Sequence, residues 1–179
     1  MRALTHFSVP IKGLKDGIHQ YQFRIGDDFF KKFEKSIIKK GSFQIEIDLF
    51  KKSNHIEIDF FIEGMMKTDC DRCLAKIDLP VEGNHKLIVK FTVDEINNEE
   101  EVWTITYDTH ELDLDKAIYE FVNLSVPLIK RFDCEIEDPI PCNLNAKDYL
   151  DREYDEENGE EDDDDENPFA QALRNIDLN

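Results

Sequence analysis

The sequence is short of basic residues: 22 lysines and arginines stand against 41 aspartates and glutamates, giving a formal net charge of -19. Affinity for nucleic acid comes largely from lysine and arginine side chains that displace counterions from phosphates. A net field of this sign therefore opposes general binding to RNA, to DNA or to an anionic membrane surface. Binding to a basic protein is electrostatically permitted.

Long hydrophobic runs are also missing. Residues 1–15 contain no apolar core of the signal-peptide type, and no stretch approaches the roughly 18 uninterrupted apolar residues of a membrane span. We therefore expect a cytoplasmic protein without a membrane partner. In that compartment the four cysteines are expected to be thiols or metal ligands rather than structural disulfides.

Recognisable catalytic motifs are absent as well. The chain has no G-x-S-x-G nucleophile motif, no phosphate-binding glycine loop and no H-E-x-x-H zinc motif. Its five histidines are scattered, and we interpret each as a surface or strand residue rather than a metal ligand or a catalytic base. These motifs therefore give no reason to expect an enzyme or a small-molecule substrate.

Length and charge distribution indicate one folded domain followed by a tail. A chain of 179 residues suits a single domain. Residues 151–179 hold 13 acidic and 2 basic residues, which is more than half of the net charge. Such a stretch repels itself and has little apolar content, so we expect a folded domain over residues 1–150 and a disordered acidic tail over residues 151–179.

The tail ends in a different pattern. Asn167-Pro168 is typical of the start of a helix, and Phe169, Leu173 and Ile176 fall on one face of that helix. About nine residues cannot hold a helix alone in water. We therefore expect the segment to order only when it docks, and we take its three apolar residues as candidate partner-binding residues. The alternative is a tail that only solubilises the domain, with the last helix folded back on its own sheet.

Alternation of apolar and polar residues predicts that most of the folded domain is sheet. It runs over residues 43–49 and 56–62, which we expect to form an antiparallel pair joined by a turn. It resumes over residues 77–81 and 87–93, on either side of a turn expected at Gly83-Asn84, and again over residues 102–107. Near the start of the chain, residues 5–11 and 20–25 are expected to form a hairpin or two short strands.

A helical period occurs twice. Apolar residues recur at helical spacing from residue 29 to residue 37, after Asp27 as N-cap, which predicts a short helix ending near Gly41. From Asp113 the same period predicts a second helix, whose apolar face includes Leu124 and which ends at Pro127. The expected fold class is α+β: a curved antiparallel sheet of about five to seven strands with two helices packed on it.

The four cysteines fall as two pairs in predicted loops. Cys70 and Cys73 form a C-x-x-C between two expected strands, with the spacing that zinc favours for two ligands from one tight turn. Cys134 and Cys142 are separated by seven residues, so this pair would need a wide loop. A structural zinc site made by all four, unmetallated thiols in structured turns, and thiol redox chemistry stay open as interpretations.

Short basic clusters interrupt the acidic domain. The main ones are Lys39-Lys40, Lys51-Lys52 and Lys130-Arg131. We interpret them as solvated turn residues and as protection of strand edges. The functional alternative is a local patch that contacts RNA, and Lys130 and Arg131 are candidate partner-binding residues on that interpretation.

Several short motifs occur in order along roughly residues 40–175: Gly64, Cys70-x-x-Cys73-Leu74, Leu112-Asp113-Leu114-Asp115, Leu124-Ser125-Val126-Pro127-Leu128, Cys134, Cys142-Asn143-Leu144-Asn145 and Asn167-Pro168-Phe169-Ala170-Gln171-Ala172-Leu173. As an ordered set they resemble the YceD family, bacterial and plastid proteins linked to accumulation of the large-subunit ribosomal RNA. The resemblance implies a non-enzymatic factor in making the large ribosomal subunit, commonly encoded beside a small basic ribosomal protein of that subunit. It carries the family's cysteine pattern onto Cys70 and Cys73.

Three functions are consistent with these patterns. The first is an assembly factor that binds a basic ribosomal protein or a large-subunit precursor, with the anionic tail holding the polycation and the apolar end of the tail as an anchor. The second is a zinc-stabilised module in which the four cysteines fix two loops that touch a folded RNA. The third is a thiol-dependent redox protein with Cys70 as the nucleophile.

Overall fold

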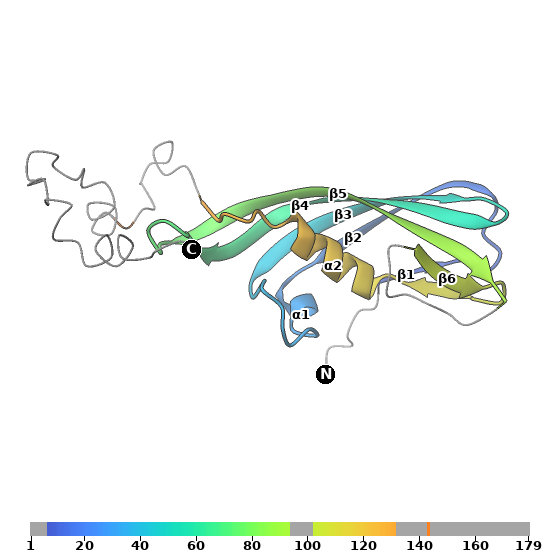
Figure 1. Ribbon diagram of the computed structural model, residues 1–179, viewed down its shortest axis with the longest axis horizontal. Helices are drawn as coiled ribbons and strands as arrows, with labels where there is room; N and C mark the ends of the chain where they lie inside the picture. Colours follow the sequence, from blue (N-terminus) through green and yellow to red (C-terminus); the bar gives the residue numbers. More distant parts are fainter. Residues whose placement is uncertain (1–6, 94–101, 132–142, 144–179) are drawn as a thin grey trace, which may run out of the picture. The chain divides into compact units, whose positions relative to one another are not determined.

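The computed structural model describes residues 7–93, 102–131 and 143. All of these except Asn143 belong to one unit, Met1–Pro141. Its elements follow in this order (Figure 1): β1 (Ser8–Pro10), β2 (Gly17–Ile25), α1 (Asp27–Phe30), β3 (Gly41–Lys51), β4 (His55–Asp69), β5 (Lys76–Thr92), β6 (Val102–Thr106), β7 (Glu111–Asp113) and α2 (Asp115–Ser125). The domain boundary predicted at residue 150 and the acidic tail lie outside the described residues.

The strands form a five-stranded sheet, in the order β2-β3-β4-β5-β6, and a two-stranded sheet of β1 and β7. Neighbouring strands are antiparallel from β2 to β5, whereas β6 runs parallel to β5. The predicted α+β class with a curved sheet and two helices is confirmed, although the last strand pair departs from the antiparallel pattern. The first two strands, β1 and β2, do not form a hairpin with each other, because β1 pairs with β7 and β2 pairs with β3.

One face of the large sheet forms the core. Successive residues of a strand point to opposite faces, and the buried apolar positions of β3 and β4 share one face. These positions are at most 3 % exposed: Phe43, Ile45, Ile47, Leu49, Ile56, Ile58, Phe60 and Ile62. We call this the inner face and the opposite one the outer face. The helix α2 packs on the inner face, where the rings of Phe121 and Phe60 are 5.0 Å apart between centroids (Figure 1).

Strand β5 runs without a break through the turn predicted at Gly83-Asn84. Gly83 pairs with Ile62 and Asn84 pairs with Phe61 on β4, so the predicted turn is wrong. Position 83 belongs to the inner face and lies beneath α2: a Cβ atom on Gly83 would be 2.0 Å from Ser125 Oγ. The glycine therefore lets the helix approach the sheet and does not reverse the chain.

The first helix, α1, is a single turn, whereas the pattern predicted a helix ending near Gly41. Past Phe30 the backbone continues in turns held by bonds between residues three apart, as from Phe33 N to Phe30 O at 3.1 Å. Ile38 is fully buried in the core, whereas Ile37 is 63 % exposed. The helical spacing therefore identified the wrong isoleucine, and the helix prediction is wrong beyond the first turn.

The second predicted helix is confirmed as α2. At its start, Asp113 Oδ1 accepts a hydrogen bond from the backbone N–H of Asp115 at 2.8 Å, which satisfies one of the unpaired amides of the first turn. At its end, Val126 is extended, as the residue before Pro127 is biased to be. Leu124 is 70 % exposed, so its predicted place on the buried face is wrong.

Candidate functional site

Cys70 and Cys73 lie in the turn at the tip of the longest hairpin, between the end of β4 at Asp69 and the start of β5 at Lys76. Two backbone bonds close this turn: Cys70 N donates to Ala75 O at 2.8 Å, and Leu74 N donates to Cys70 O at 2.9 Å. Both cysteine side chains are buried, at 2 % and 1 % exposure. We call residues 70–75 the cysteine turn.

Leu74 has a left-handed backbone, with a φ of 58°, and its side chain is 73 % exposed. A bulky residue in this region costs free energy of the order of 1–3 kcal/mol and persists only where its surroundings enforce it. The backbone bonds of the cysteine turn supply that enforcement. The strain directly follows Cys73 and fixes the direction in which the chain leaves the second thiol.

A segment 59 residues later in the chain is bonded to the cysteine turn. Asp71 N donates to Lys130 O at 2.9 Å, and Lys130 N donates to Asp71 Oδ2 at 2.7 Å. The ammonium of Lys130 also lies 3.5 Å from Asp71 Oδ1. In Figure 1 the chain leaving α2 runs toward the free end of the β4–β5 hairpin. The structure thus brings three of the predicted site residues together: Cys70, Cys73 and Lys130.

The other predicted site residues have different outcomes. Arg131 is exposed and its backbone N–H donates to Ile129 O at 3.1 Å, next to the cysteine turn but without a described contact to it. The remaining predicted ligands and anchors lie outside the described residues: Cys134, Cys142, Phe169, Leu173 and Ile176. Their roles stay predictions.

The cysteine turn offers two sulfur donors from one tight turn, which fits half of a tetrahedral zinc site. Within residues 7–93 and 102–131, no group of three or more histidine, cysteine, aspartate or glutamate side chains is placed to share a metal ion. A complete site would therefore need ligands from outside these residues, and the predicted ones are Cys134 and Cys142.

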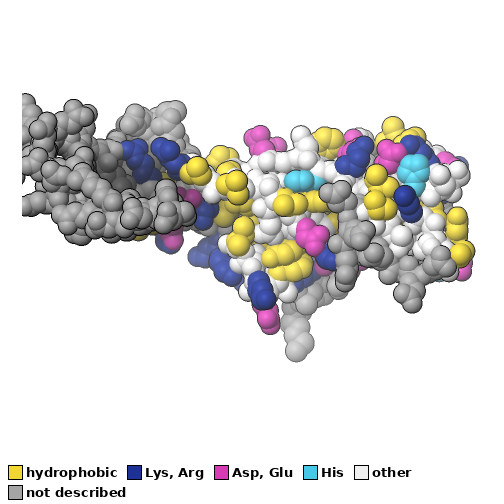
Figure 2. Space-filling view, in the orientation of Figure 1, with side chains coloured by type: hydrophobic (Ala, Val, Ile, Leu, Met, Phe, Trp, Pro, Cys, Tyr) yellow, Lys and Arg dark blue, Asp and Glu magenta, His cyan; other side chains and the backbone are white. Residues whose placement is uncertain are grey.

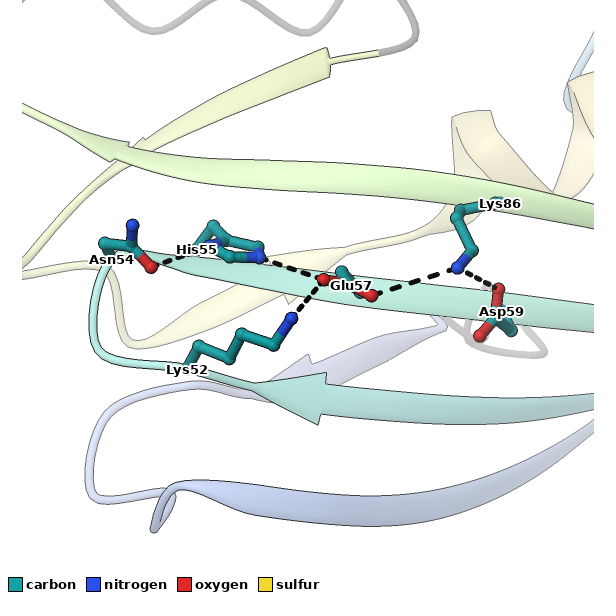
Figure 3. Close-up of polar contacts among 6 residues, drawn as sticks. All are labelled: Lys52, Asn54, His55, Glu57, Asp59 and Lys86. Carbon is teal, nitrogen blue, oxygen red and sulfur yellow. Dashed lines mark hydrogen bonds and ion pairs between the residues drawn. The ribbon is translucent and has the colours of Figure 1, made fainter.

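A separate charged network lies on the outer face, at the other end of the β4–β5 hairpin (Figure 3). Glu57 Oε1 is 2.5 Å from Lys52 Nζ and 3.0 Å from His55 Nε2. Lys86, on β5, is 3.8 Å from the other oxygen of Glu57 and 3.3 Å from Asp59 Oδ1. Sequence reasoning missed this network; the signal was the two-residue spacing of His55, Glu57 and Asp59, which places them on one face of a strand.

The network holds Glu57 ionised. The hydrogen bond from Lys52, then the contact with His55 and the charges of Lys52 and Lys86, lower the pKa of Glu57 from 4.5 to about 2. A carboxylate whose pKa lies this far below neutrality is a poor general base at neutral pH. We therefore assign the network to stabilising the hairpin rather than to catalysis.

His85 is a packing residue on the inner face. Its ring stacks on Phe121 with centroids 4.8 Å apart, and its Nε2 lies 2.8 Å from Ser125 Oγ. Burial lowers the pKa of His85 below its ordinary value of 6.5. Loss of hydration on burial therefore favours the neutral ring in the folded domain.

Comparison with known proteins identifies the family. A family model described as "Large ribosomal RNA subunit accumulation protein YceD" matches residues 58–178, about two thirds of the chain. The chain belongs to the YceD family. No curated protein and no solved structure matches it. Among the helices that the structure describes, none is long and apolar enough to cross a bilayer.

The YceD match begins inside β4 and so leaves β2 and β3 outside. These two strands nevertheless belong to the same sheet, because β3 pairs with β4 along eleven positions. Gly64, one of the residues that carried the resemblance, lies at this junction. A Cβ atom there would be 2.4 Å from Ser42 O and 2.6 Å from Phe43 Cδ1, so the close approach of β3 requires glycine.

Another YceD-like motif, Leu112–Asp115, connects three parts of the domain. Both of its leucines are at most 3 % exposed, and Asp113 Oδ1 accepts a hydrogen bond from the first residue of α2. The carboxylate of Asp115 accepts a hydrogen bond from the backbone N–H of Phe7 at 2.9 Å and an ion pair from Lys32 at 2.8 Å. The motif therefore has a structural role in this YceD-family chain.

Proposed function

We propose that the protein is a non-enzymatic factor in biogenesis of the large ribosomal subunit, which acts by binding a basic ribosomal protein or a precursor particle. The observation that carries this proposal is the YceD family match over residues 58–178. Its printed description concerns accumulation of the large-subunit ribosomal RNA. In this role the protein works in the cytoplasm, where the precursors are, and influences the RNA through a protein that binds it.

Charge supports a protein as the direct partner. With a net charge of -19, the chain repels phosphate, whereas ribosomal proteins that fold onto RNA are polycations. On the face that carries α2, lysine and arginine side chains are interspersed with acidic and hydrophobic ones (Figure 2). That distribution does not resemble the continuous basic stripe of a nucleic-acid surface.

The surroundings of Glu57 and His85 also support a non-enzymatic role. Glu57 is held ionised by the cations around it, and His85 is packed between the sheet and α2. Glu57 is a poor general base at neutral pH, and the ring of His85 is engaged with Phe121 and Ser125.

The test is co-sedimentation and pull-down with the full chain, using large-subunit precursors in one arm and free large-subunit ribosomal proteins in the other. We expect recovery with at least one of these, and we expect recovery to fall as salt rises. Removing residues 151–179 should lower both recovery and its salt sensitivity, because this stretch holds more than half of the net charge.

A matched control separates the charge of the tail from its apolar end. Serine at positions 169, 173 and 176 leaves every tail charge in place, so the salt sensitivity should be kept while the affinity falls. Unchanged recovery and unchanged salt sensitivity after the truncation would show that the tail does not hold the partner. Absence of the full chain from both precursors and ribosomal proteins would refute the function itself.

A second candidate, a zinc-stabilised RNA-contact module, is favoured by the bonds between Asp71 and Lys130. They tie the cysteine turn to a chain segment that reaches Cys134 only four residues later. On this proposal Cys70, Cys73, Cys134 and Cys142 hold one zinc ion and fix two loops that touch a folded RNA.

Metal analysis of the gently purified chain tests this candidate. A closed site predicts one zinc ion per chain, and less than about 0.2 would contradict it. Cys70→Ser should remove the metal, whereas Thr68→Ser, two residues earlier on β4, should retain it. Full cellular function of the Cys70→Ser variant would also remove the third possibility, a redox protein that uses Cys70 as nucleophile.

A further inference from the structure

The outer face of the sheet is water-exposed yet carries large apolar side chains. Phe60 contacts α2 on the inner face, so its neighbour Phe61 points outward and is 41 % exposed. Met65, four residues along the same strand, is 45 % exposed, and Ile18 and Phe50 pair on β2 and β3 at 71 % and 39 % exposure. The wet face of an antiparallel sheet is ordinarily polar. A partner that covers this face would therefore bury apolar area.

Phe61 lines a shallow hollow of about 370 Å³. Its rim holds three carboxylates, from Glu46 on β3, Glu63 on β4 and Glu82 on β5. Glu63 and Glu82 are directly opposite each other in the strand register, where like charges repel. Within the described part of the chain, neither makes an ion pair. A cation in the hollow would relieve this repulsion.

The outer face carries two groups of carboxylates, one paired with lysines and one not in contact with a described cation. At one end, Glu57 and Asp59 are held by Lys52 and Lys86, as Figure 3 shows. Among residues 7–93 and 102–131, no cation is in hydrogen-bond or ion-pair contact with the carboxylates of Glu46, Glu63 or Glu82. Glu46 accepts hydrogen bonds only from amide side chains, of Gln22 and Gln44 at 3.2 Å each, among the described contacts.

A cation–π contact within the domain shows how a basic side chain can bind an aromatic ring on the outer face. Lys52 Nζ lies 4.9 Å from the ring centroid of Phe50, a cation–π contact on this same outer face. Phe61 presents a comparable ring to solvent, bordered by carboxylates that accept bidentate hydrogen bonds from a guanidinium. The hollow thus combines an aromatic ring and acidic acceptors that together favour an arginine or lysine side chain.

We propose that the outer face around Phe61, Glu63 and Glu82 binds an arginine- or lysine-rich segment of a partner protein. The proposal rests on the proposed function, since it assigns the basic partner a place on the folded domain in addition to the tail. Charge complementarity selects this occupant: three carboxylates around one ring repel a phosphate backbone and attract a polycation. The exposed apolar side chains nearby pack against the methylene stems of the basic residues.

The experiment titrates the full chain with a fluorescein-labelled peptide of alternating arginine and serine and follows its anisotropy. In the test variant, Glu63→Gln with Glu82→Gln, we expect binding to weaken about tenfold, since two charge-assisted contacts are lost. In the matched control, Glu57→Gln with Asp59→Asn, the same net charge is removed from the compensated end of the same face. There we expect a change of less than about twofold.

Both double variants keep the acidic tail, so binding of the peptide to the tail contributes equally to each. Phe61→Leu keeps an apolar strand residue but removes the ring, and we expect it to weaken binding roughly threefold. This variant also tests the surface if the double variant does not fold. Equal weakening in the test and control variants, or no weakening in the test variant, would overturn the proposal.

Failure of this proposal is distinguishable from failure of the proposed function. A Glu63→Gln, Glu82→Gln chain that binds the peptide normally, while the wild-type chain co-sediments with large-subunit precursors, refutes only the outer-face site. The opposite pair of results is also informative. If the Glu63→Gln, Glu82→Gln variant binds the peptide selectively more weakly, but the wild-type chain recovers neither precursors nor ribosomal proteins, the site is supported and the biogenesis role is refuted.

Discussion

At the scale of single residues, Glu57 shows how a strand face can set a pKa. The pKa of Glu57 is about 2 in the folded domain and 4.5 without these contacts. The network therefore stabilises the fold fully above pH 4.5, and this stabilisation is lost as the pH falls from 4.5 through about 2. We predict a carboxyl titration near pH 2 for Glu57 in the NMR spectrum. Lys52→Met should raise that midpoint toward 4.5, because the hydrogen bond from Lys52 makes the largest contribution to lowering the pKa of Glu57.

The control for this prediction is Lys76→Met, which removes an exposed lysine paired with Asp69 near the cysteine turn. It should leave the Glu57 midpoint in place. If both variants move the midpoint equally, the shift arises from the overall charge of the domain and the local contacts are not its cause.

His85 makes a second residue-scale prediction, with a different pH window. Because burial lowers its pKa in the folded state, the unfolded chain takes up the proton first as the pH falls. The contribution of His85 to the free energy of unfolding should be complete above pH 6.5 and decrease below it. Urea unfolding across this range, with His85→Phe as the comparison, measures the effect. An identical pH slope in the variant would contradict it.

At the scale of elements, the packing of α2 on β5 depends on a glycine. A Cβ atom at position 83 would lie 2.0 Å from Ser125 Oγ and 2.7 Å from Ser125 Cβ. Gly83→Ala should therefore lower the free energy of unfolding by about 1–3 kcal/mol. Gly26→Ala is the control, because its Cβ would meet only Gly41 O, at an ordinary 3.8 Å.

Urea unfolding of Gly83→Ala, Ser125→Gly and the double variant completes the test. Removing the Ser125 side chain makes room for the added methyl group, so the double variant should be more stable than the sum of the single effects predicts. Additive effects would place the strain somewhere other than at the contact between the helix and the strand.

The sequence predicted the strands well because their alternation is regular. It placed a turn at Gly83-Asn84 because glycine commonly marks turns, yet Val81 and Leu87 both keep the inward parity of one continuous strand. The parallel pairing of β6 with β5 could not be predicted, because alternation reports which face is buried and not which strand is the neighbour. The first helix has one turn, shorter than predicted, because the backbone after Phe30 buries Ile38 in the core and not Ile37.

The candidate sites were predicted in part, for a related reason. The C-x-x-C at Cys70 and Cys73 is a local pattern and was visible in the chain. The bonds between Asp71 and Lys130 join residues 59 apart, and the hollow around Phe61 assembles side chains from three strands. Such contacts follow from strand register, which one sequence does not specify.

At the scale of the whole domain, Asp115 connects segments that are distant in the chain. Phe7 donates its backbone N–H to Oδ1 at 2.9 Å, and Lys32 contacts Oδ2 at 2.8 Å, so the first strand region, the segment after α1 and the start of α2 meet at one carboxylate. The side chains of Lys32 and Asp115 are only 16 % and 13 % exposed. Removing Asp115 would take away both the acceptor of the Phe7 N–H and a carboxylate that pairs with a largely buried ammonium.

We therefore predict that Asp115→Ala lowers the free energy of unfolding by about 1.5–3 kcal/mol, because it removes a largely buried charged acceptor from two hydrogen bonds. Glu120→Ala, which removes an exposed pair with Lys116 at 3.9 Å, should cost no more than about 0.5 kcal/mol. Urea unfolding of both variants makes the comparison. Equal costs would mean that the three segments are held by their apolar contacts alone, because a carboxylate that links them must cost more to remove than one exposed on a single helix.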